Sequence, residues 1–312
     1  MQLIRVLDRA LDFAWRNGLE RLTRYRWGDR MYGAVAFWLA RGTFPSRRPR
    51  TCCEHVVRLK MSSEILDPLR QLVTDKEYVR DYITALMGKD YVVPAIAFLR
   101  SPAEVEAYEF PARCVIKPTH SSGRYILRRH AFDPVDRETI RNWFAHDYYP
   151  VAREANYRHL RPKVIVEEVL SFGRKLPDDY KIHCFSGRPR LIHVLSNRFL
   201  GKPTGSIYSP FWERLPFIIN APPGPDVLRP RNLERIVEIA ARLSAPFSYV
   251  RVDLYTDGQR VYVGELTNIP GGGLMRFDPP EADALTGAFF ADPDLEPRKV
   301  YAPLNGMRMA AE

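Results

Sequence analysis

Apolar residues in the first part of the chain follow the spacing of a helix. Leucine, isoleucine and tryptophan recur at steps of three and four residues between Leu3 and Leu22, mostly with arginines between them. An apolar stripe with this period predicts an amphipathic helix with a basic face. Such a helix either packs against the rest of the protein or lies on an anionic membrane surface or a partner. The Pro- and Arg-containing stretch 42–51 predicts a linker after it.

Beyond this linker, helical and strand patterns alternate. A helical pattern covers residues 63–87, and strands 248–256 and 260–267 flank Asp257-Gly258, a dipeptide typical of hairpin turns. The other predicted elements are an apolar run at 91–99, strands at 113–117, 163–170, 180–186 and 190–196, and a helix at 231–243. Hairpins mixed with helices predict an α+β fold rather than a purely parallel sheet.

The composition is that of a folded protein. The chain has 312 residues, 46% hydrophobic and 27% charged, which is enough for one large or two moderate domains. Its longest apolar run, residues 33–40, is far shorter than the roughly 20 residues that span a bilayer, and no signal peptide precedes it. Four cysteines without metal-binding spacing do not indicate a disulfide framework. We therefore expect a cytoplasmic protein.

Positive charge is concentrated near the start of the chain. The net charge is +10, and residues 1–50 carry eleven arginines against four acidic residues. The chain uses nine lysines against 38 arginines, so lysine is the rarer cation. Each lysine is therefore a candidate for a specific role.

Lys117 ends a β-branched strand and is followed by a loop of small residues. Its ammonium supplies a positive charge, while the hydroxyl and glycine residues after it let backbone N–H groups approach phosphate oxygens. An ordinary strand and turn explains the same residues.

The adjacent carboxylates Glu167 and Glu168 lie in an apolar run, so at least one needs an edge position or a partner. That partner is either a nucleotide or one of the many arginines.

A third polar group occupies the strand that begins near residue 180. Asp179, Lys181 and His183 alternate with apolar residues and share one face of the strand. This face is a candidate active-site wall, although a half-exposed strand with an Asp–Lys pair explains it equally.

The sharpest signal is a carboxylate pair in the final hairpin. Asp253 and Glu265 lie on its two strands, within a residue or two of facing each other. Facing carboxylates repel unless a cation lies between them, and Mg²⁺ prefers carboxylate and phosphate oxygens. A divalent metal resolves the repulsion; alternatively Arg251, on the face of Asp253, neutralises one acid. The loop 270–273, Pro-Gly-Gly-Gly, follows either as a substrate-facing loop or as a flexible connector.

The order of these motifs resembles the ATP-grasp superfamily. The stretches DKEYVRDY, VIKPTHSSG, DDYKIHCFSGRPRLI and RVDLY with VGELTNIPGG are similar to the TupA-like ATP-grasp proteins of teichuronic-acid and surface-polysaccharide biosynthesis in bacteria. The resemblance covers roughly residues 60–280. It implies an ATP-grasp fold in which two α+β subdomains, 59–168 and 169–290, clasp ATP. A basic helical segment and linker, 1–58, precede them, and a tail, 291–312, follows.

The resemblance also implies roles for individual residues. Lys76 and Lys117 contact ATP phosphates, the loop from Ser121 to Arg124 closes over them, and Glu167 or Glu168 marks the adenine hinge. Many members have Asn two residues after the metal-binding Glu, where this chain has Thr267, so the third metal ligand is open. The implied groups are catalytic Lys181, Arg198 and Arg251; cofactor-binding Lys76, Lys117, Ser121, Ser122, Gly123, Glu167 and Glu168; and metal-binding Asp253, Glu265, Thr267 and Asn268.

The implied reaction is ATP-dependent ligation of a carboxylate, such as a uronic acid of a polysaccharide precursor, to an amine. It proceeds through an acyl phosphate and needs ATP with Mg²⁺ or Mn²⁺. The implied partners are glycan or small-molecule substrates, in the cytoplasm, with the N-terminal helix available for peripheral contact with the inner face of the membrane.

Three alternatives remain at this point. A kinase of a sugar or alcohol would use the same ATP and Mg²⁺ with His183 or Asp179 as base. A basic nucleic-acid-binding protein would fit the net charge, but the charge lies in the first 50 residues and Asp253 and Glu265 oppose phosphate without metal. No nucleic-acid partner is therefore expected. The third is an ATP-binding scaffold without turnover.

Overall fold

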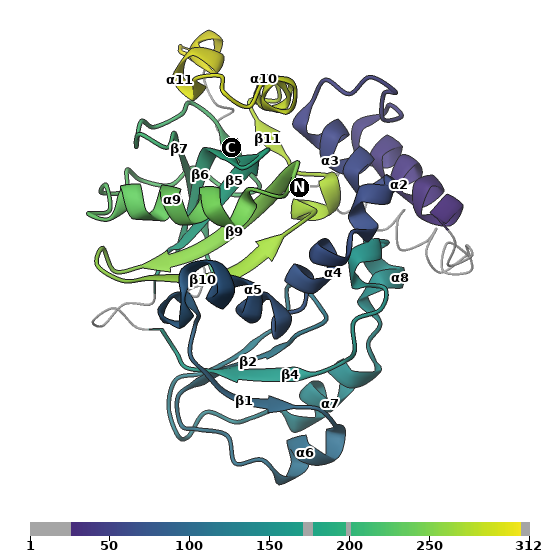
Figure 1. Cartoon of the computed structure of the whole chain (residues 1–312), viewed down its shortest axis with the longest axis vertical. Coiled ribbons are helices and arrows are strands. Elements are labelled where there is room, and N and C mark those ends of the chain that lie inside the picture. Colours follow the sequence, from purple (N-terminus) through teal and green to yellow (C-terminus); the bar gives the residue numbers. More distant parts are fainter. Residues whose placement is uncertain (1–25, 171–176, 198–200, 307–312) are drawn as a thin grey trace.

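The computed structural model describes residues 26–170, 177–197 and 201–306. It contains two antiparallel sheets with helices around them (Figure 1). The smaller sheet has the strand order β1-β4-β2-β3, the larger has the order β10-β9-β5-β6-β7, and β8 and β11 form a two-stranded sheet. This is the mixed helix-and-sheet class that the sequence predicts.

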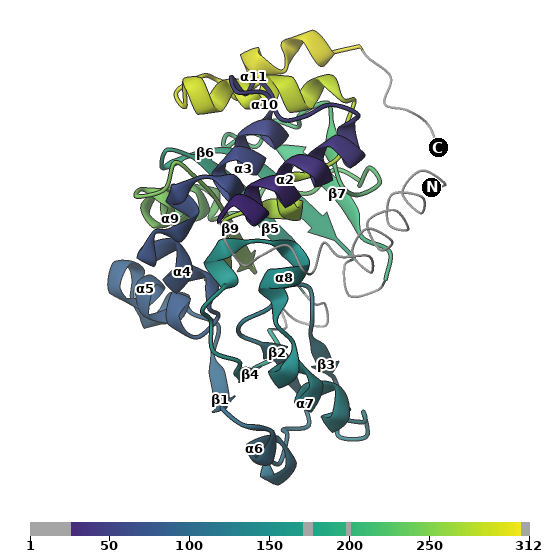
Figure 2. The same ribbon diagram turned by 90° about the vertical axis from the view of Figure 1, so that its right-hand side faces the viewer.

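Two helices precede the sheets. α2 (Arg26–Arg41) and α3 (Cys52–Met61) are joined by the stretch predicted as a linker, and Thr51 caps α3 through a capping box with Glu54. α3 packs between α2, α10 (Glu281–Ala291) and the glycine-rich turn η6 (Pro270–Gly273). The amphipathic helix predicted between Leu3 and Leu22 lies outside the described residues. Figure 2 shows α2 and α3 running side by side above α8.

The helix predicted over 63–87 is interrupted twice. The structure has η2 (Ser63–Leu66), α4 (Pro68–Thr74) and α5 (Tyr78–Met87) instead. Asp67 caps α4, whose first residue is proline, so a new helix starts there. Asp75 ends α4 in an extended conformation, and the gap before α5 holds Lys76. The predicted helical pattern is present but divided into three segments, because apolar periodicity does not register such caps.

The smaller sheet has its own core. Its strands are β1 (Ala95–Leu99), β2 (Cys114–Pro118), β3 (Ile126–Arg128) and β4 (Val164–Glu167). α6 (Pro102–Ala107) and α7 (Arg137–Ala145) pack on it through residues such as Val105, Ile140 and Trp143. α8 (Tyr148–Ala152) and η4 (Ala155–Tyr157) lead back toward α2. η3 (Lys89–Tyr91) precedes β1.

The larger sheet carries the predicted hairpin. Its strands are β5 (Asp179–Phe185), β6 (Arg188–Ser196), β7 (Thr204–Tyr208), β9 (Tyr249–Thr256) and β10 (Val261–Thr267). α9 (Leu233–Ser244) buries its apolar face against β5, β6 and β9. Every residue of β5 is buried, so the half-exposed strand considered for this segment was wrong. α9 covers one face of it, and on the other face Lys181 lies between Asp179 and Asp253.

The remaining elements close one end of the larger sheet. They are β8 (Ile218–Ile219), η6 (Pro270–Gly273), β11 (Phe277–Asp278), α10 (Glu281–Ala291), α11 (Pro297–Val300) and η7 (Ala302–Leu304). Gly273 in η6 has φ +82°, and a Cβ there would lie 2.6 Å from Cγ2 of Val57. Glycine is therefore required for η6 to approach α3.

A β-bulge in the hairpin sets the direction of Glu265. Val263 pairs with Leu254, but Glu265 pairs with Asp253, so Gly264 is an extra residue in β10. If β10 continued from Val263 without a bulge, Glu265 would share the core face of Val263 and would pair with Val252. The bulge places both carboxylates on the same face.

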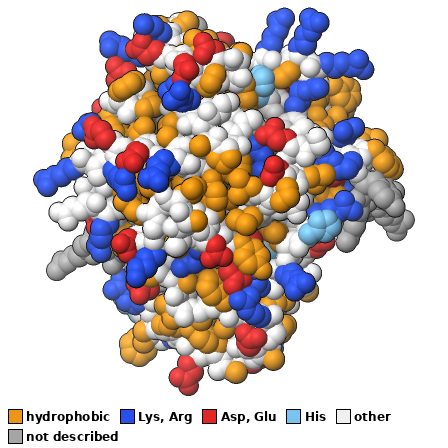
Figure 3. Space-filling view, viewed as in Figure 1, with side chains coloured by type: hydrophobic (Ala, Val, Ile, Leu, Met, Phe, Trp, Pro, Cys, Tyr) orange, Lys and Arg blue, Asp and Glu red, His pale blue; other side chains and the backbone are white. Residues whose placement is uncertain are grey.

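The surface shown in Figure 3 carries basic and acidic side chains interspersed over most of the face. The four cysteines are buried and unpaired. Among the described helices, none combines the length and the apolar character needed to span a bilayer.

Candidate functional site

A cleft of about 370 Å³ lies between the two sheets. Its volume falls within the range of small-molecule sites. Apolar side chains from both sheets line part of it, and charged side chains line the rest. The apolar group is Val93, Val115, Leu127, Val169, Leu170 and Leu195, with Tyr255; the charged group is Lys76, Lys117, Arg124, Glu167, Glu168, Lys181, Arg251, Asp253 and Glu265.

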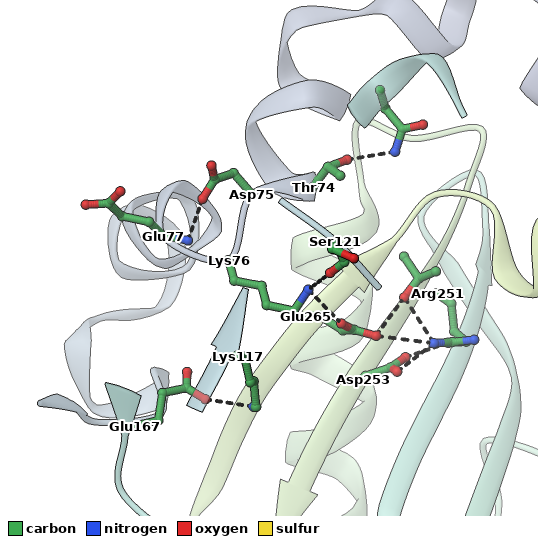
Figure 4. Close-up of polar contacts among 12 residues, drawn as sticks. Thr74, Asp75, Lys76, Glu77, Lys117, Ser121, Glu167, Arg251, Asp253 and Glu265 are labelled. Atoms are coloured by element: carbon green, nitrogen blue, oxygen red, sulfur yellow. Dashed lines mark hydrogen bonds and ion pairs between the residues drawn. The ribbon is translucent and has the colours of Figure 1, made fainter. Parts of the chain in front are cut away.

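Lys76 is held in the cleft by the turn between α4 and α5. The backbone N–H of Lys76 donates to the Thr119 carbonyl, and the fully buried Asp75 pairs with Lys163 Nζ at 3.0 Å. The Lys76 ammonium donates to the Ser121 carbonyl at 2.6 Å and lies 4.0 Å from Glu265 (Figure 4). Burial lowers the pKa of Lys76, while Glu265 opposes that effect. The helix break thus delivers a lysine to the cleft.

Lys117 and Glu167 form an ion pair on the smaller sheet. β2 and β4 are neighbours, and Lys117 Nζ donates to Glu167 at 2.7 Å. Arg80 of α5 lies 3.7 Å from the other oxygen of Glu167. The buried carboxylate predicted to need a partner therefore has two, one of them the lysine proposed for phosphate. Glu168 is exposed and also lines the cleft.

The carboxylate pair of the larger sheet already has cations around it. Arg251 donates to both oxygens of Asp253, at 2.6 and 2.7 Å, and lies 3.5 Å from Glu265. Lys181, opposite Asp253 on β5, donates to it as well. Burial would raise the pKa of Asp253, but Arg251 and Lys181 hold it below its usual value. The arginine alternative considered from sequence is thus the arrangement in this structure.

The donor set at this pair fits Mg²⁺. Magnesium is commonly bound by one or two protein carboxylates with substrate phosphates as the other ligands. Asp253 and Glu265 supply two carboxylates on one cleft wall, and Glu265 is 35% exposed. Among the described residues, no group of three or more His, Cys, Asp and Glu side chains is placed to hold a metal. The pair therefore suits a metal that arrives with phosphate.

The loop after Lys117 forms one lip of the cleft. Ser122, Gly123 and Arg124 are exposed and line it, and Gly123 has φ +74° with open space around it. Ser121 is buried instead, and only its backbone carbonyl takes part, through Lys76.

Two candidate metal ligands have different surroundings. Thr267 donates to Glu265 at 3.2 Å and accepts from Arg251 at 3.0 Å, so it lies beside the carboxylate pair. Asn268 is buried away from the pair: its oxygen accepts from Arg70 at 2.7 Å, and its nitrogen donates to the Arg70 carbonyl and to Thr74. Asn268 follows the last residue of β10, and these bonds to Arg70 and Thr74 hold its amide in this structure rather than the carboxylate pair. Arg198 lies outside the described residues.

A second cavity, of about 310 Å³, adjoins the cleft and shares Ser122 and Arg251 with it. The sequence reasoning missed two of its charged residues, Lys60 and Glu154, which are 4% and 5% exposed. The rarity of lysine in this chain is a signal that pointed to Lys60. Nothing in the sequence around Glu154 marks it. The other lining residues include Tyr32, Ala36, Tyr148, Tyr157, Thr267 and Gly272.

The family model described as TupA-like ATP-grasp matches residues 55–291. The chain belongs to the TupA-like ATP-grasp family. Membership confirms the resemblance and the fold class that the sequence predicts. No curated protein sequence matches the chain.

Solved structures with a similar fold are distant in sequence. D-alanine–D-alanine ligase from Helicobacter pylori is 14% identical, with 72% of this chain and 59% of that chain covered and a TM-score of 0.40. L-amino acid ligase from Bacillus licheniformis is 15% identical, with 78% and 55% covered and a TM-score of 0.38. The ATP-grasp ligase PsnB, in complex with a precursor variant, Mg and ADP, is 11% identical, with 69% and 57% covered and a TM-score of 0.35. The chain spans about three fifths of the length of the first of these, and similarity at this level concerns the fold alone.

Proposed function

We propose that this protein is an ATP-dependent carboxylate–amine ligase that acts through an acyl phosphate. The observation that carries the proposal is the division of one cleft into an apolar part and a part lined by five lysine or arginine residues and two facing carboxylates. A nucleoside triphosphate has the same division, with a flat base at one end and phosphates at the other. The match to the family supports this orientation.

In this proposal the adenine lies between the two sheets. Val115 and Leu127 come from the smaller sheet and Leu195 from the larger, so an aromatic ring inserted between them is in contact on both faces. Glu168, at the end of β4, is placed to accept from the adenine amino group or a ribose hydroxyl. Glu167 is less suited, because Lys117 and Arg80 already occupy its oxygens.

The lysines hold the phosphates. Lys76 and Lys117 reach the cleft from two different elements, and the exposed loop Ser122–Arg124 supplies backbone N–H groups beside them. Arg251 balances the negative charge that develops as the γ-phosphoryl group moves to the carboxylate substrate. Asp253 and Glu265 would hold Mg²⁺, which neutralises phosphate charge and aligns the phosphoryl group.

The reaction then joins carboxylate and amine. The carboxylate oxygen attacks the γ-phosphorus and ADP leaves, which gives an acyl phosphate. The amine attacks the acyl carbon, and phosphate leaves as the amide forms. The loop at Ser122 to Arg124 covers the phosphates and excludes water, which protects the acyl phosphate from hydrolysis.

We further propose that the carboxylate belongs to a uronic acid of a bacterial surface-polysaccharide precursor. The family to which the chain belongs supports this choice. The basic N-terminal segment is compatible with work close to an anionic membrane surface.

The kinase alternative is weakened by the positions of its proposed bases. His183 is buried, its Nδ1 is 2.7 Å from the Tyr249 hydroxyl, and burial holds the pKa of its ring well below the usual value. Neither His183 nor Asp179 lines the cleft among the described residues.

Hydroxylamine trapping separates these functions. The protein is incubated with ATP, Mg²⁺, hydroxylamine and either glucuronate or galacturonate. A ligase of this type releases ADP and forms the acyl hydroxamate of its carboxylate substrate. ADP release with a stable phosphorylated sugar and no hydroxamate would identify a kinase and overturn the proposal.

A further inference from the structure

The second cavity holds two buried charged groups with few contacts. Within the described residues the carboxylate of Glu154 has no hydrogen bond or ion pair, although it is 95% buried and lines the cavity. The Lys60 ammonium has one long contact, 3.4 Å to the Gly272 carbonyl, and lies 5.3 Å from the centre of the Tyr32 ring. Leaving such groups unpaired is costly unless a ligand completes them.

These two groups are separate but close enough to interact. They form no ion pair, yet each affects the other's titration: Lys60 opposes the burial that raises the pKa of Glu154 to about 7. Burial lowers the pKa of Lys60, while Glu154 and Asp29 oppose that effect. The space between them is therefore flanked by a cation on α3 and a carboxylate before η4.

The cavity is next to the reacting end of the cleft. Arg251 and Ser122 line both spaces, and Thr267, which bonds to Glu265 and Arg251, lines the second. A molecule in the second cavity thus meets the place where the phosphoryl group of ATP is proposed to lie.

We propose that the second cavity is the acceptor site and takes an amine that carries its own carboxylate, with Lys60 binding the carboxylate and Glu154 accepting a proton from the ammonium. This inference depends on the ligase function proposed above. A zwitterion of this kind pairs its carboxylate with Lys60 and its ammonium with Glu154. A simple amine or a simple acid would leave one of these two buried charges unpaired.

The proton transfer prepares the nucleophile. One proton of the ammonium moves to an oxygen of Glu154, and the freed lone pair forms the bond to the acyl carbon. The carbon–oxygen bond to phosphate breaks, and phosphate leaves with that electron pair. The second proton lost from nitrogen ends on phosphate. A carboxyl group that titrates near neutral pH is suited to this role.

The acceptor site also gives a role to the segment before the family match. Tyr32 and Ala36 of α2 line the cavity, and they precede residue 55, where the match begins. The Tyr32 hydroxyl donates to the Val151 carbonyl and so joins α2 to α8 on the opposite side. Acceptor choice is therefore set partly by residues outside the family match.

Binding of amino acids tests the proposal without turnover. The probes are the proteinogenic amino acids and β-alanine, each compared by calorimetry with its decarboxylated amine and its deaminated acid. We expect at least one amino acid to bind with a Kd below about 10 mM, and both of its truncated forms to bind roughly tenfold more weakly.

Two variants divide the site. Lys60→Met should weaken binding of the amino acid roughly tenfold and leave binding of the decarboxylated amine unchanged. Glu154→Gln should weaken binding of the decarboxylated amine and leave binding of the deaminated acid unchanged. Lys299→Met and Glu296→Gln, an exposed pair far from the cavity, serve as matched controls and should bind as wild type. If a charge variant does not fold, Ala36→Leu, which fills the cavity without altering charge, should also block amino acids.

ATP binding in the presence of Mg²⁺ is measured for each protein. Wild type that binds ATP but no amino acid below about 10 mM, or binding that survives Lys60→Met, Glu154→Gln and Ala36→Leu, would overturn the acceptor site and leave the ligase proposal intact. Wild type that binds amino acids but no ATP would instead overturn the ligase proposal.

Discussion

The two cavities differ in how their charges are satisfied. In the cleft, each buried carboxylate has cations within contact: Glu167 has Lys117 and Arg80, and Asp253 has Arg251 and Lys181. In the second cavity, Lys60 and Glu154 are equally buried and do not form an ion pair. The protein's own cations neutralise the buried carboxylates of the cleft. In the second cavity the two opposite charges are not paired with each other, and a ligand can pair with both.

This difference predicts different binding behaviour. ATP phosphates entering the cleft compete with Glu167 for Lys117, and a metal competes with Arg251 and Lys181 for Asp253. Part of the binding free energy is spent on these exchanges. A zwitterion entering the second cavity competes only with the long contact between Lys60 and the Gly272 carbonyl among the described residues. The predictions below test this contrast, beginning with the largest expected effect.

Removal of both carboxylates of the hairpin should have the largest effect. In the double variant Asp253→Asn/Glu265→Gln, ADP release should fall by about a thousandfold or more, because the metal and the phosphoryl group lose their ligands. Asp226→Asn/Glu234→Gln, on the exposed surface, is the matched control. Activity within tenfold of wild type would mean that this pair is structural.

The Lys117–Glu167 pair should show coupling. Lys117→Met should weaken ATP binding by about tenfold to a hundredfold, because a phosphate contact is lost and Glu167 loses a partner. Adding Glu167→Gln to Lys117→Met should restore ATP affinity by about fivefold, since no unpaired carboxylate then repels the phosphates. ATP dissociation constants for the two single variants and the double variant measure this. If the two single substitutions change the free energy of ATP binding additively in the double variant, Glu167 and phosphate do not compete for Lys117.

Glu154 should decrease stability at neutral pH. Burial raises the pKa of Glu154 to about 7 from 4.5, so the folded state holds this proton more tightly than the unfolded state. Stability from this group is full below about pH 4.5 and is lost as the pH rises through about 7. Glu154→Gln should therefore raise the free energy of unfolding by about 1–3 kcal/mol at pH 8 and leave it nearly unchanged at pH 4.

Several charged or titratable groups surround Glu154 and enter this prediction. They come from α2, α3, α8, η4 and β9, and they are Tyr32, Lys60, Tyr148, Tyr157 and Arg251. Urea titrations of wild type and Glu154→Gln at both pH values test the sign. An equal difference at the two pH values would place the titration elsewhere.

The smallest expected effect concerns the bulge. A Cβ at Gly264 would lie 2.9 Å from the Tyr255 ring, whose far edge can shift, so Gly264→Ala should cost about 1 kcal/mol of stability. Deleting Gly264 is the sharper variant, because it restores a regular ladder in which Glu265 follows Val263 directly and still lies on the face of Asp253. Both variants should therefore keep ATP binding; loss of ATP binding in the deletion alone would show that the bulge does more than set the face of Glu265.

The fold class and the charged part of the cleft were accessible from sequence because their signals are local. Lys117 follows a β-branched run, and Asp253 and Glu265 flank a recognisable turn. The bulge that points Glu265 into the cleft was not predictable, since an extra residue leaves no periodic signal. The surroundings of Asn268 were not predictable for a similar reason: only tertiary contacts show that its side chain bonds to Arg70.

The second cavity depends on contacts between distant parts of the chain. Lys60 and Glu154 are 94 positions apart in the sequence and meet only because α2, α3 and η4 assemble around η6. Glu154 has neither a neighbouring motif nor an apolar pattern that marks it as buried. Tertiary packing, rather than local pattern, creates this site.

Magnesium dependence of ATP binding tests the central claim most directly. Calorimetry of wild type should give clear ATP binding that strengthens when Mg²⁺ or Mn²⁺ is added. Lys117→Ala should weaken it under both conditions, and Asp253→Asn/Glu265→Gln should lose only the strengthening by metal. Folded wild type that binds no ATP at millimolar concentrations with either metal would contradict the account.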